Sequence, residues 1–248
     1  MIDTSASEQP ALVRVATWNL ERKKPTTPTG TAGVQHLESL DADVLMLTES
    51  RLSYPAGHGY IVASQSWGDA DERKVLMWSA QPWTDVDDVG SVEFPPSRFV
   101  AATTNTPIGP VRVFGVCISW HMANVQYGNR NRRPWQDHIT YCRALRTLIG
   151  EFDRSLPLVV AGDFNQRLSN AKLGTSQRAL EIARAFDGIE IVTADPVPGW
   201  NRPENDHIAV EGLSSVSVRG WGNVVKGVRC SDHGGVAVDF SIDRPSRG

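Results

Sequence analysis

Short apolar runs of strand length recur along the chain, separated by Gly, Pro or Asp. Many of them are rich in β-branched residues, which favours strands over helices. The runs that predict strands lie at 13–20, 43–49, 60–66, 74–79, 99–104, 111–119, 156–164, 207–210, 216–220 and 234–240. Apolar spacing typical of a helix is clearest at 33–41, 134–152 and 176–187. The pattern therefore predicts many strands and few helices.

The order of these elements constrains the fold. A doubly wound nucleotide-binding fold needs strands and helices in regular alternation and a glycine-rich first turn, and the sequence has neither. Two packed mixed sheets with helices on the outside fit the pattern better. No internal repeat, low-complexity tract or linker divides the 248 residues. We therefore expect a disordered lead-in at residues 1–11 and a single domain at residues 12–248.

Polar side chains interrupt the apolar runs near their ends. Because strand ends in a layered sheet protein tend to lie along common edges, such groups can meet although they are distant in sequence. Glu49 is especially informative, since an acid at the end of a buried strand must be paired or bound to a metal. The residues placed in this way are Asn19, Glu49, His121, Asp163, Asn165, Asp206, Asp232 and His233.

Carboxylates combined with amide oxygens make a hard-oxygen site, which suits Mg²⁺ or Mn²⁺. Zinc is the competitor, because Cys230 and His233 are close in sequence, but no second Cys or His pair at ligand spacing accompanies them. The sequence also lacks the GxSxG elbow, the Walker loop and the GxGxxG turn. The pattern thus favours a magnesium or manganese site over acyl-hydrolase, NTPase or dinucleotide chemistry.

Composition adds limits on partners and location. The chain has 25 Lys and Arg against 28 Asp and Glu, a net charge of -3, which by itself argues against a strongly basic nucleic-acid binder. Three widely spaced cysteines predict reduced core residues rather than a disulfide framework. The start of the sequence resembles no secretory signal, and no run approaches a membrane span. We expect a cytoplasmic protein that does not bind membranes, and no obligate protein partner is evident.

Six short motifs carry a resemblance to a known family. They are WNLE (18–21), LMLTES (45–50), SWH (119–121), GDFN (162–165), NDHIAV (205–210) and SDH (231–233). In this order they resemble the endonuclease/exonuclease/phosphatase superfamily, and in particular its deoxyribonuclease-like, metal-dependent phosphoesterases. The resemblance implies an α/β fold, a four-layer sandwich with two central mixed β-sheets flanked by helices. It also implies hydrolysis of phosphate esters with Mg²⁺ or Mn²⁺.

The resemblance also implies roles for individual residues. It implies that Asn19, Glu49 and Asp232 face the metal. It implies catalytic roles for six other residues: His121, Asp163, Asn165, Asp206, His233 and Glu72. Asp163 and Asn165 would orient the attacking water and the phosphoryl oxygens. His233 would be the catalytic imidazole oriented by Asp206, and His121 a second histidine partnered by Glu72. Whether Asp163 or the His233–Asp206 pair takes the proton from water stays open at this point.

Several arginines are candidates for substrate contact. Arg51 matches an arginine that contacts phosphate in the deoxyribonuclease branch, and Arg98 is similarly placed just before a strand. The segment NRNRRPW brings Arg130, Arg132 and Arg133 next to Trp135, a combination that suits phosphate contact and base stacking. The run ISWHMAN lacks the tyrosine-containing strand motif of AP endonucleases, which argues against abasic-site repair.

The leading hypothesis is a metal-dependent phosphodiesterase that hydrolyses DNA or RNA by in-line attack of water, as an endonuclease or an exonuclease. The alternative is a phosphoesterase for small or lipid-linked phosphates, of the inositol phosphate type. A binding protein that keeps the fold without turnover is disfavoured, because it has no need for costly converging polar groups. Assigning five acids to the site leaves a modestly basic remainder. This predicts nucleic-acid binding that weakens with salt.

Overall fold

The computed structural model describes residues 11–54, 57–125, 132–168, 176–200, 202 and 204–242. Its helices are α1 (Pro28–Ser39), α2 (Gln136–Gly150) and α3 (Gln177–Ala185). Its strands are β1 (Val13–Asn19), β2 (Val44–Arg51), β3 (Tyr60–Ala63), β4 (Ser66–Trp67), β5 (Asp69–Ser79), β6 (Trp83–Asp87), β7 (Phe99–Thr106), β8 (Gly109–Cys117), β9 (Leu158–Asp163), β10 (Glu190–Ile191), β11 (Asp206–Glu211), β12 (Leu213–Trp221), β13 (Val224–Val225), β14 (Val228–Arg229) and β15 (Gly235–Ile242). Of the expected lead-in, residues 1–10 lie outside the described residues.

Two mixed sheets form the centre of the molecule. One has the strand order β12-β15-β1-β2-β5-β3, with β4 also paired to β5, and the other has the order β10-β11-β9-β8-β7-β6. Each sheet contains one parallel pair, β1 with β2 and β8 with β9, and the other pairs are antiparallel. The mixed character that the sequence predicts is confirmed.

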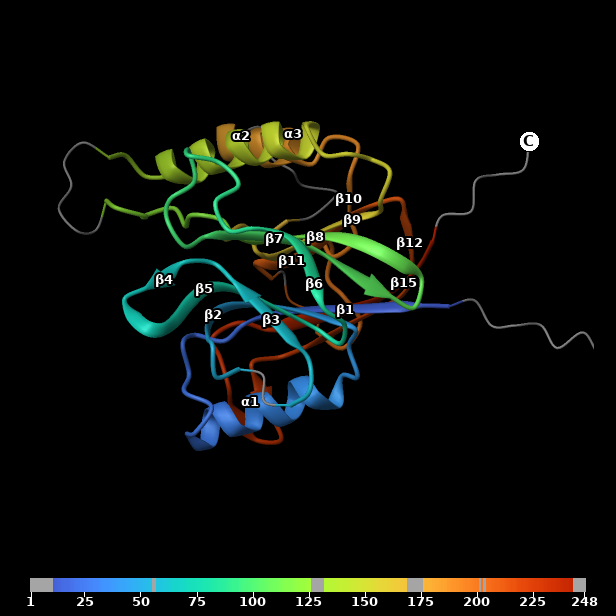
Figure 1. Ribbon diagram of the computed structural model, residues 1–248. Helices are drawn as coiled ribbons and strands as arrows, with labels where there is room; N and C mark the ends of the chain where they lie inside the picture. Colours follow the sequence, from blue (N-terminus) through green and yellow to red (C-terminus); the bar gives the residue numbers. More distant parts are fainter. Residues whose placement is uncertain are drawn as a thin grey trace, which may run out of the picture.

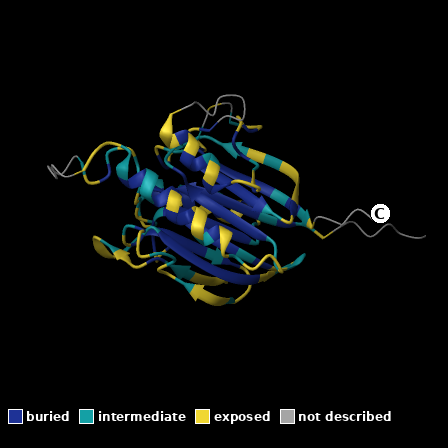
Figure 2. Cartoon of the chain, turned by 90° about the horizontal axis from the view of Figure 1, so that it is seen from above, coloured by how far each residue is buried: buried dark blue, intermediate teal, exposed yellow. Residues whose placement is uncertain are grey.

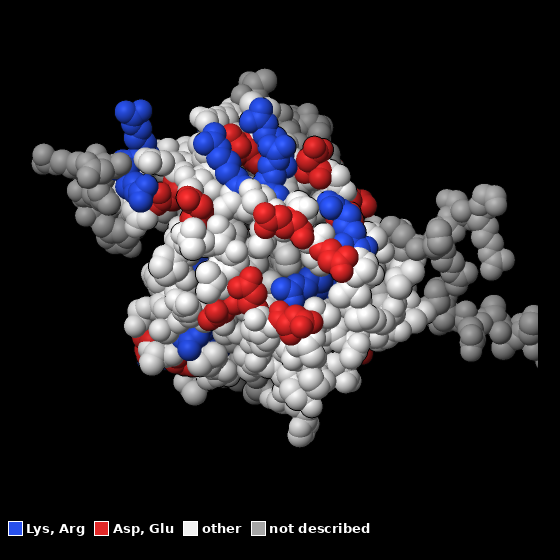
Figure 3. All heavy atoms as spheres, turned by 45° about the horizontal axis from the view of Figure 1, so that its top comes forward, with Lys and Arg blue, Asp and Glu red and all other residues white. Residues whose placement is uncertain are grey.

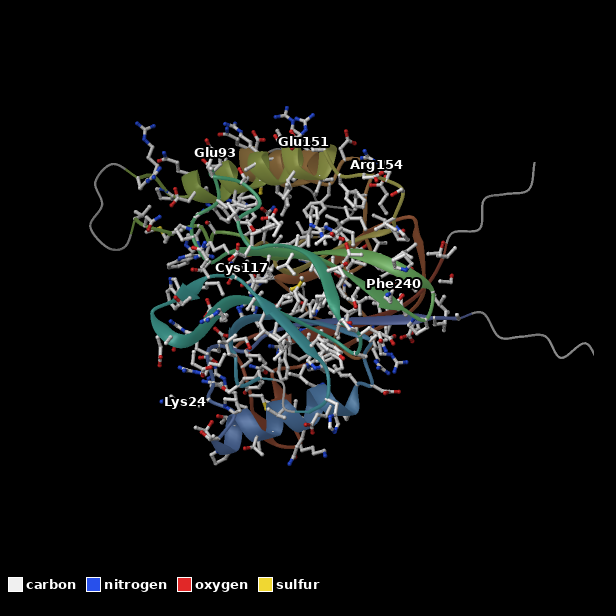
Figure 4. The ribbon with its side chains drawn as sticks, in the orientation of Figure 1. Lys24, Glu93, Cys117, Glu151, Arg154 and Phe240 are labelled. Atoms are coloured by element: carbon white, nitrogen blue, oxygen red, sulfur yellow. The ribbon has the colours of Figure 1, made fainter. Side chains whose placement is uncertain are left out.

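The two sheets pack face to face with helices on both outer faces (Figure 1). Between the sheets lies a cluster of mainly β-branched side chains that includes Cys117 and Phe240, both labelled in Figure 4. The helices α2 and α3 cover one outer face with a second apolar cluster, and α1 covers the other with a third. Figure 2 shows the resulting buried strands under half-exposed helices. The predicted four-layer α/β sandwich is confirmed.

Helix α1 begins earlier than the apolar spacing at 33–41 predicts. Its N-cap is Thr27, whose hydroxyl accepts a hydrogen bond from the backbone N–H of Gly30 at 3.2 Å, and Pro28 occupies the first turn. A threonine cap followed by proline is a strong start signal, because the threonine hydroxyl accepts from a free N–H group of the first turn and proline has no N–H that needs a partner. The apolar spacing missed this turn because it carries few apolar residues.

The other two helices differ from prediction in detail. The helix expected at 134–152 begins two residues later, since α2 starts at Gln136 and its N-cap Trp135 has a left-handed backbone with φ 69°. In α3, within the expected range 176–187, Leu180 is 45% exposed while Ile182 and Ala185 are buried. The apolar spacing therefore located both helices but not their exact starts.

The topology brings functional strand ends to one edge of the sandwich. The parallel strands β1 and β2 end there, and the antiparallel neighbour β15 begins there. In the other sheet, β8 and β9 end at the same edge, and β11 begins there with Asp206 directly opposite Asp163. This edge therefore collects polar groups from both sheets.

The three cysteines Cys117, Cys142 and Cys230 are free and buried, as the sequence predicts. No helix within the described ranges has both the length and the apolar character needed to cross a membrane.

Candidate active site

His233 and Asp206 form a hydrogen-bonded pair at this edge. Nδ1 of His233 donates to Oδ2 of Asp206 at 2.6 Å, and Asp206 is fully buried. Burial alone would lower the pKa of His233, but the charge and hydrogen bond of Asp206 raise it to about 11. The carboxylate thus fixes the tautomer and favours the imidazolium form, with Nε2 left as the ring atom available to a substrate.

The turn that carries His233 is tied to β1. The hydroxyl of Ser231 donates to the carbonyl oxygen of Asn19 at 2.6 Å and accepts from the backbone N–H of His233 at 3.0 Å. The indole N–H of Trp18 donates to the carbonyl oxygen of His233 at 3.0 Å. These bonds explain why the SDH motif has a serine first, since its hydroxyl sets the position of the histidine.

Asp163, at the end of β9, lies beside this pair in the second sheet. Its carboxylate accepts from Nδ2 of Asn19 at 3.0 Å and from both the backbone N–H and Nδ2 of Asn165, at 2.8 and 3.0 Å. Burial raises the pKa of Asp163 to about 7 against the lowering effect of the His233 charge. The bond between Asn19 and Asp163 joins the two sheets at the site.

The GDFN motif has a specific backbone shape. Gly162 has φ 138°, and a Cβ there would overlap the carbonyl oxygen of Val116 on the neighbouring strand, so glycine is required. Asn165 has φ 51°, a conformation that asparagine tolerates well, and its Nδ2 also donates to the carbonyl oxygen of Ile118 at 2.8 Å. The motif therefore turns the chain so that Asp163 and Asn165 face the same space.

Glu49, near the end of β2, is held by two cations. Its Oε1 is 2.7 Å from Nζ of Lys74, and its Oε2 is 3.4 Å from Nε of Arg22. Burial alone would raise the pKa of Glu49, but Lys74 and Arg22 lower it below its ordinary value. Nζ of Lys74 also lies 3.8 Å from the ring centroid of Trp67. Glu49 is therefore ionised and paired.

These groups line one cavity of about 500 Å³. Its wall includes Asn19, Glu49, Asp163, Asn165, Asp232 and His233 from the expected site, together with Arg98, whose Nη1 donates to the carbonyl oxygen of Cys117 at 3.0 Å. It also includes Arg22, Trp67 and Lys74, which the sequence reasoning missed. Lys74 carries a usable signal, because a lysine directly before the apolar run VLMW of a predicted strand needs a partner when buried.

The donor set fits a divalent ion. The amide oxygen of Asn19 and the carboxylates of Glu49 and Asp232 are hard-oxygen donors, and all three residues line the cavity. One potential ligand atom each from Asp163, Asp206 and His233 also lie within 4.8 Å of one another. An ion at this second position would displace the proton between His233 and Asp206. That proton suits an acid–base group better than a ligand, which leaves Asn19, Glu49 and Asp232 as candidate ligands along the cavity wall.

Glu72 and Arg51 differ from the predicted roles. Glu72 was expected to partner His121, but its Oε1 accepts from Nη2 of Arg51 on the adjacent strand β2. Arg51 was expected to contact substrate, yet it is buried and also lies 3.6 Å from Asp69 and from Asp71. Its charge is neutralised by three acids, so it is not available to a phosphate. Both residues belong to a structural ion-pair group between β2 and β5.

His121 was expected in the catalytic cavity but lies in the one beside it. Its ring centroid is 5.5 Å from that of Trp135 and 5.1 Å from that of Trp120. The catalytic cavity is lined by Trp120 and Asn165 on this side, and His121 is absent from its described lining. Glu72 thus contacts Arg51 and His121 contacts Trp120 and Trp135, and a catalytic role for His121 with Glu72 stays a prediction.

The arginine segment near α2 does not reach the cavity either. Arg132 pairs with Asp137 at 3.5 Å, Arg133 is exposed, and neither is among the described residues that line a cavity; Arg130 lies outside the described residues. Farther along, Arg143 pairs with Glu181 at 2.8 Å and Arg154 with Glu211 at 2.7 Å. Figure 3 shows basic and acidic side chains interspersed on the face that α2 and α3 form. Of the described arginines in this region, Arg132, Arg143 and Arg154 are therefore paired with acids.

Comparison with known proteins connects this geometry to a family. A model described as "Endonuclease/Exonuclease/phosphatase family" matches residues 16–233. Among the curated proteins, none is similar enough in sequence to count as a match.

Several solved structures share the fold. The 3′-5′ exonuclease NExo of Neisseria meningitidis is 20% identical with a TM-score of 0.67, covering 94% of this chain and 100% of that chain. An AP endonuclease of Archaeoglobus fulgidus is 13% identical with a TM-score of 0.67, at the same coverage. D. rerio TDP2 in complex with a single-strand DNA product is 13% identical with a TM-score of 0.65, covering 93% of this chain and 99% of that chain. At these identities the likeness shows the fold.

Proposed function

The chain belongs to the endonuclease/exonuclease/phosphatase family, and from this premise we propose that it is a divalent-metal-dependent phosphodiesterase that cleaves nucleic acid. The observation that carries the proposal is the His233–Asp206 pair beside Asp163, at a cavity that also holds Asn19, Glu49 and Asp232. This combination supplies an oriented imidazole, a buried carboxylate and an oxygen donor set within one space.

Each side chain of the site has a separate role in the in-line attack of water. His233, held as an imidazolium by Asp206, presents Nε2 to the phosphoryl oxygens and stabilises the negative charge that builds up there. Asp163 is then the group that accepts the proton of the attacking water, and Asn165 orients that water. A divalent ion held by Asn19, Glu49 and Asp232 would polarise the phosphoryl group and offset charge on the leaving oxygen.

Nucleic acid is the substrate class that the surroundings favour. Arg22, Lys74 and Arg98 place positive charge along the cavity wall, and Trp67 and Trp120 add flat apolar surface beside them. Cations combined with aromatic rings suit a chain of phosphates and bases. The family name points the same way, as do the similar AP endonuclease and 3′-5′ exonuclease and the TDP2 structure with a single-strand DNA product. Whether the cleavage is internal or terminal is decided by the assay below.

The test is a hydrolysis assay with plasmid DNA, end-labelled single-stranded DNA, RNA, bis-nitrophenyl phosphate and inositol phosphates, each with Mg²⁺, Mn²⁺ or EDTA. We expect cleavage of at least one nucleic acid with either metal and none in EDTA. His233→Ala and Asp163→Ala should each lower the rate roughly 10²- to 10⁴-fold, the usual contribution of a positioned acid or base. The size of the labelled products separates internal from terminal cleavage.

The matched control is Glu151→Ala, an exposed acid just after the C-terminal end of α2 and labelled in Figure 4. It should keep the full rate. A folded His233→Ala variant with wild-type activity would contradict the proposal, as would cleavage that EDTA does not affect. Turnover of inositol phosphates alone would move the function to small phosphoesters.

A further inference from the structure

A second cavity of about 550 Å³ adjoins the catalytic one. The two share Trp120 and Asn165 as a common wall, so a substrate bound at Asp163 and His233 can extend into the second cavity without leaving the protein surface. The rest of its lining comes from the segment after His121, from the segment after Asn165 and from the start of α3. No role has been given to this cavity so far.

Three planar groups are layered in its wall. The ring centroid of Trp135 is 5.5 Å from that of His121, with 36° between the two planes, and the guanidinium carbon of Arg178 lies 4.4 Å from the Trp135 centroid on α3's first turn. Arg178 and His121 are both exposed. A guanidinium group this close to an indole can add a second surface for stacking.

The backbone holds this stack in place. The N–H of Trp135 donates to the carbonyl oxygen of His121 at 2.7 Å, which ties the two ring-bearing residues together. Trp135 adopts a left-handed backbone, φ 69°, which is uncommon for a bulky residue and costs conformational energy. The buried ring of His138, on α2, lies nearly perpendicular to the ring of Trp135, with 5.1 Å between the two ring centroids. The indole is therefore fixed before any ligand arrives.

The polar groups around the stack are cations and amides. Arg167 and Arg178 supply positive charge, and Gln166, Asn205 and the shared Asn165 supply amide donors and acceptors. In the part of the chain that the structure describes, no Asp or Glu lines this cavity. A flat apolar plane, hydrogen-bonding amides and uncompensated guanidinium groups together match a nucleobase with its attached phosphate. An inorganic anion would use the cations but not the planes.

We propose that this cavity is a nucleotide subsite, in which the base next to the cleaved phosphodiester stacks on the Trp135–Arg178 pair while Arg167 faces its phosphate. The proposal rests on the phosphodiesterase activity proposed above. It changes the role of His121 from catalysis to substrate positioning, and it places base recognition at the start of α2 and α3 rather than on the arginines before α2.

The first test compares two substrates of the metal-loaded protein. Stacking of one base contributes about 1–3 kcal/mol, so Trp135→Ala should raise KM for a short oligonucleotide roughly 5- to 150-fold. The same variant should affect hydrolysis of bis-nitrophenyl phosphate less than hydrolysis of the oligonucleotide, because that ester offers no nucleobase to the subsite. Arg178→Lys, which keeps the charge but loses the plane, should also raise the oligonucleotide KM. Arg184→Ala is the matched control, since this arginine lies on the same helix outside the cavity and pairs with Glu181.

The second test needs no turnover and so separates failure of the subsite from failure of the proposed function. Adenosine 5′-monophosphate in EDTA should quench tryptophan fluorescence, and ribose 5-phosphate should bind at least tenfold more weakly. If Trp135→Ala fails to fold, Arg178→Ala takes its place, because position 178 is exposed and folding is not at risk there. Arg178→Ala should weaken binding of the nucleotide. Equal binding of the two phosphates, or an unchanged oligonucleotide KM in both Arg178 variants, would overturn the proposal.

Discussion

Lys74 is a buried cation beside Glu49, one of the proposed metal ligands. Its ammonium lies 2.7 Å from Oε1 of Glu49 and against the ring of Trp67, and it is only 5% exposed. In such a position the charge is poorly screened, and it opposes the binding of any cation at Glu49. Lys74 therefore holds Glu49 ionised while it competes with the metal.

Replacing Lys74 should consequently tighten metal binding. We expect Lys74→Met to lower the dissociation constant for Mn²⁺ by about tenfold, equivalent to about 1.4 kcal/mol, because Glu49 loses its competing partner. Calorimetric titration of the protein with Mn²⁺ measures this directly. Lys23→Met is the control, since Lys23 pairs with Glu21 at 3.1 Å and does not line the cavity. Weaker Mn²⁺ binding by Lys74→Met would show that Lys74 supports the metal site instead.

For individual residues, the sequence predicted which polar groups share an edge of the sandwich, but it did not predict the ion-pair partners of the arginines. Asp163, Asn165, Asp206 and His233 lie at or next to strand ends in short motifs, and their identity and order pointed to a shared edge. The partners of Arg51, Arg143 and Arg154 could not be inferred, because Glu72, Glu181 and Glu211 lie on other strands and helices. Whether a charged side chain is free or neutralised depends on contacts that are remote in sequence.

At the scale of elements, β11 is anchored by a buried histidine. Nε2 of His207 donates to the carbonyl oxygen of Gln166 at 3.1 Å, and the Thr193 hydroxyl lies 3.3 Å from Nδ1 while it accepts from the N–H of Ile208. Nδ1 also lies 3.0 Å from the carbonyl oxygen of Thr193, and the bonds to backbone carbonyl groups by themselves raise the pKa of the ring. Burial lowers the pKa of His207 to about 4, below its ordinary value. The histidine joins β11 to the segment after GDFN and to the loop after β10.

The stability of the fold should therefore depend on pH through His207. Because the folded-state pKa lies below the unfolded value of about 6.5, the unfolded chain binds more protons between these values. The contribution is fully present above about pH 6.5 and is lost as the pH falls towards 4, by about 2 kcal/mol between pH 7 and pH 4.5. Urea unfolding of the wild type and of His207→Gln measures it. The destabilising effect of the substitution should shrink at the lower pH, and an equal effect at both pH values would contradict this assignment.

Elements differ in how well the sequence specifies them. Eight of the ten apolar runs correspond to largely buried strands, because burial on both faces leaves continuous apolar residues. The runs at 60–66 and 216–220 correspond to the edge strands β3 and β12, which have exposed residues. The short strands β4, β6, β10, β13 and β14 were not expected, since two to five residues with exposed polar positions carry no periodic signal. For α2, the cap that starts the helix is a left-handed Trp135 rather than a standard capping residue. Its conformation is set by the bond to His121, which sequence spacing does not reveal.

At the scale of the whole molecule, the proposed metal site joins parts of the chain that the fold alone brings together. Asn19 and Glu49 lie on adjacent parallel strands, and Asp232 lies in the turn before β15, more than 180 residues farther along. A ligand that binds only when these parts are assembled stabilises the native state by mass action. Metal binding should therefore be visible in the unfolding of the entire protein.

We expect saturating Mg²⁺ or Mn²⁺ to raise the Tm. At about 100 times the dissociation constant the gain is about 2.7 kcal/mol, which corresponds to roughly 5–10 °C for a protein of this size. Differential scanning calorimetry with metal and with EDTA gives the shift. Glu49→Gln should lose most of it, and Glu151→Ala should keep it. A wild-type Tm that is the same with metal and with EDTA would count against the site.

The sequence by itself determined the fold class and several of the polar residues that line the candidate site. Both follow from local information: apolar runs that form strands, and polar motifs at the ends of those strands. Only the tertiary structure decided which groups in and around the cavity are free to act. In the folded protein, Arg51 is neutralised by Glu72 and Glu49 is paired with Lys74. His121 lies in a second cavity beside Trp135. The physical reason is that a strand fixes where its own side chains point, whereas charge compensation and stacking depend on neighbours supplied by other strands and helices.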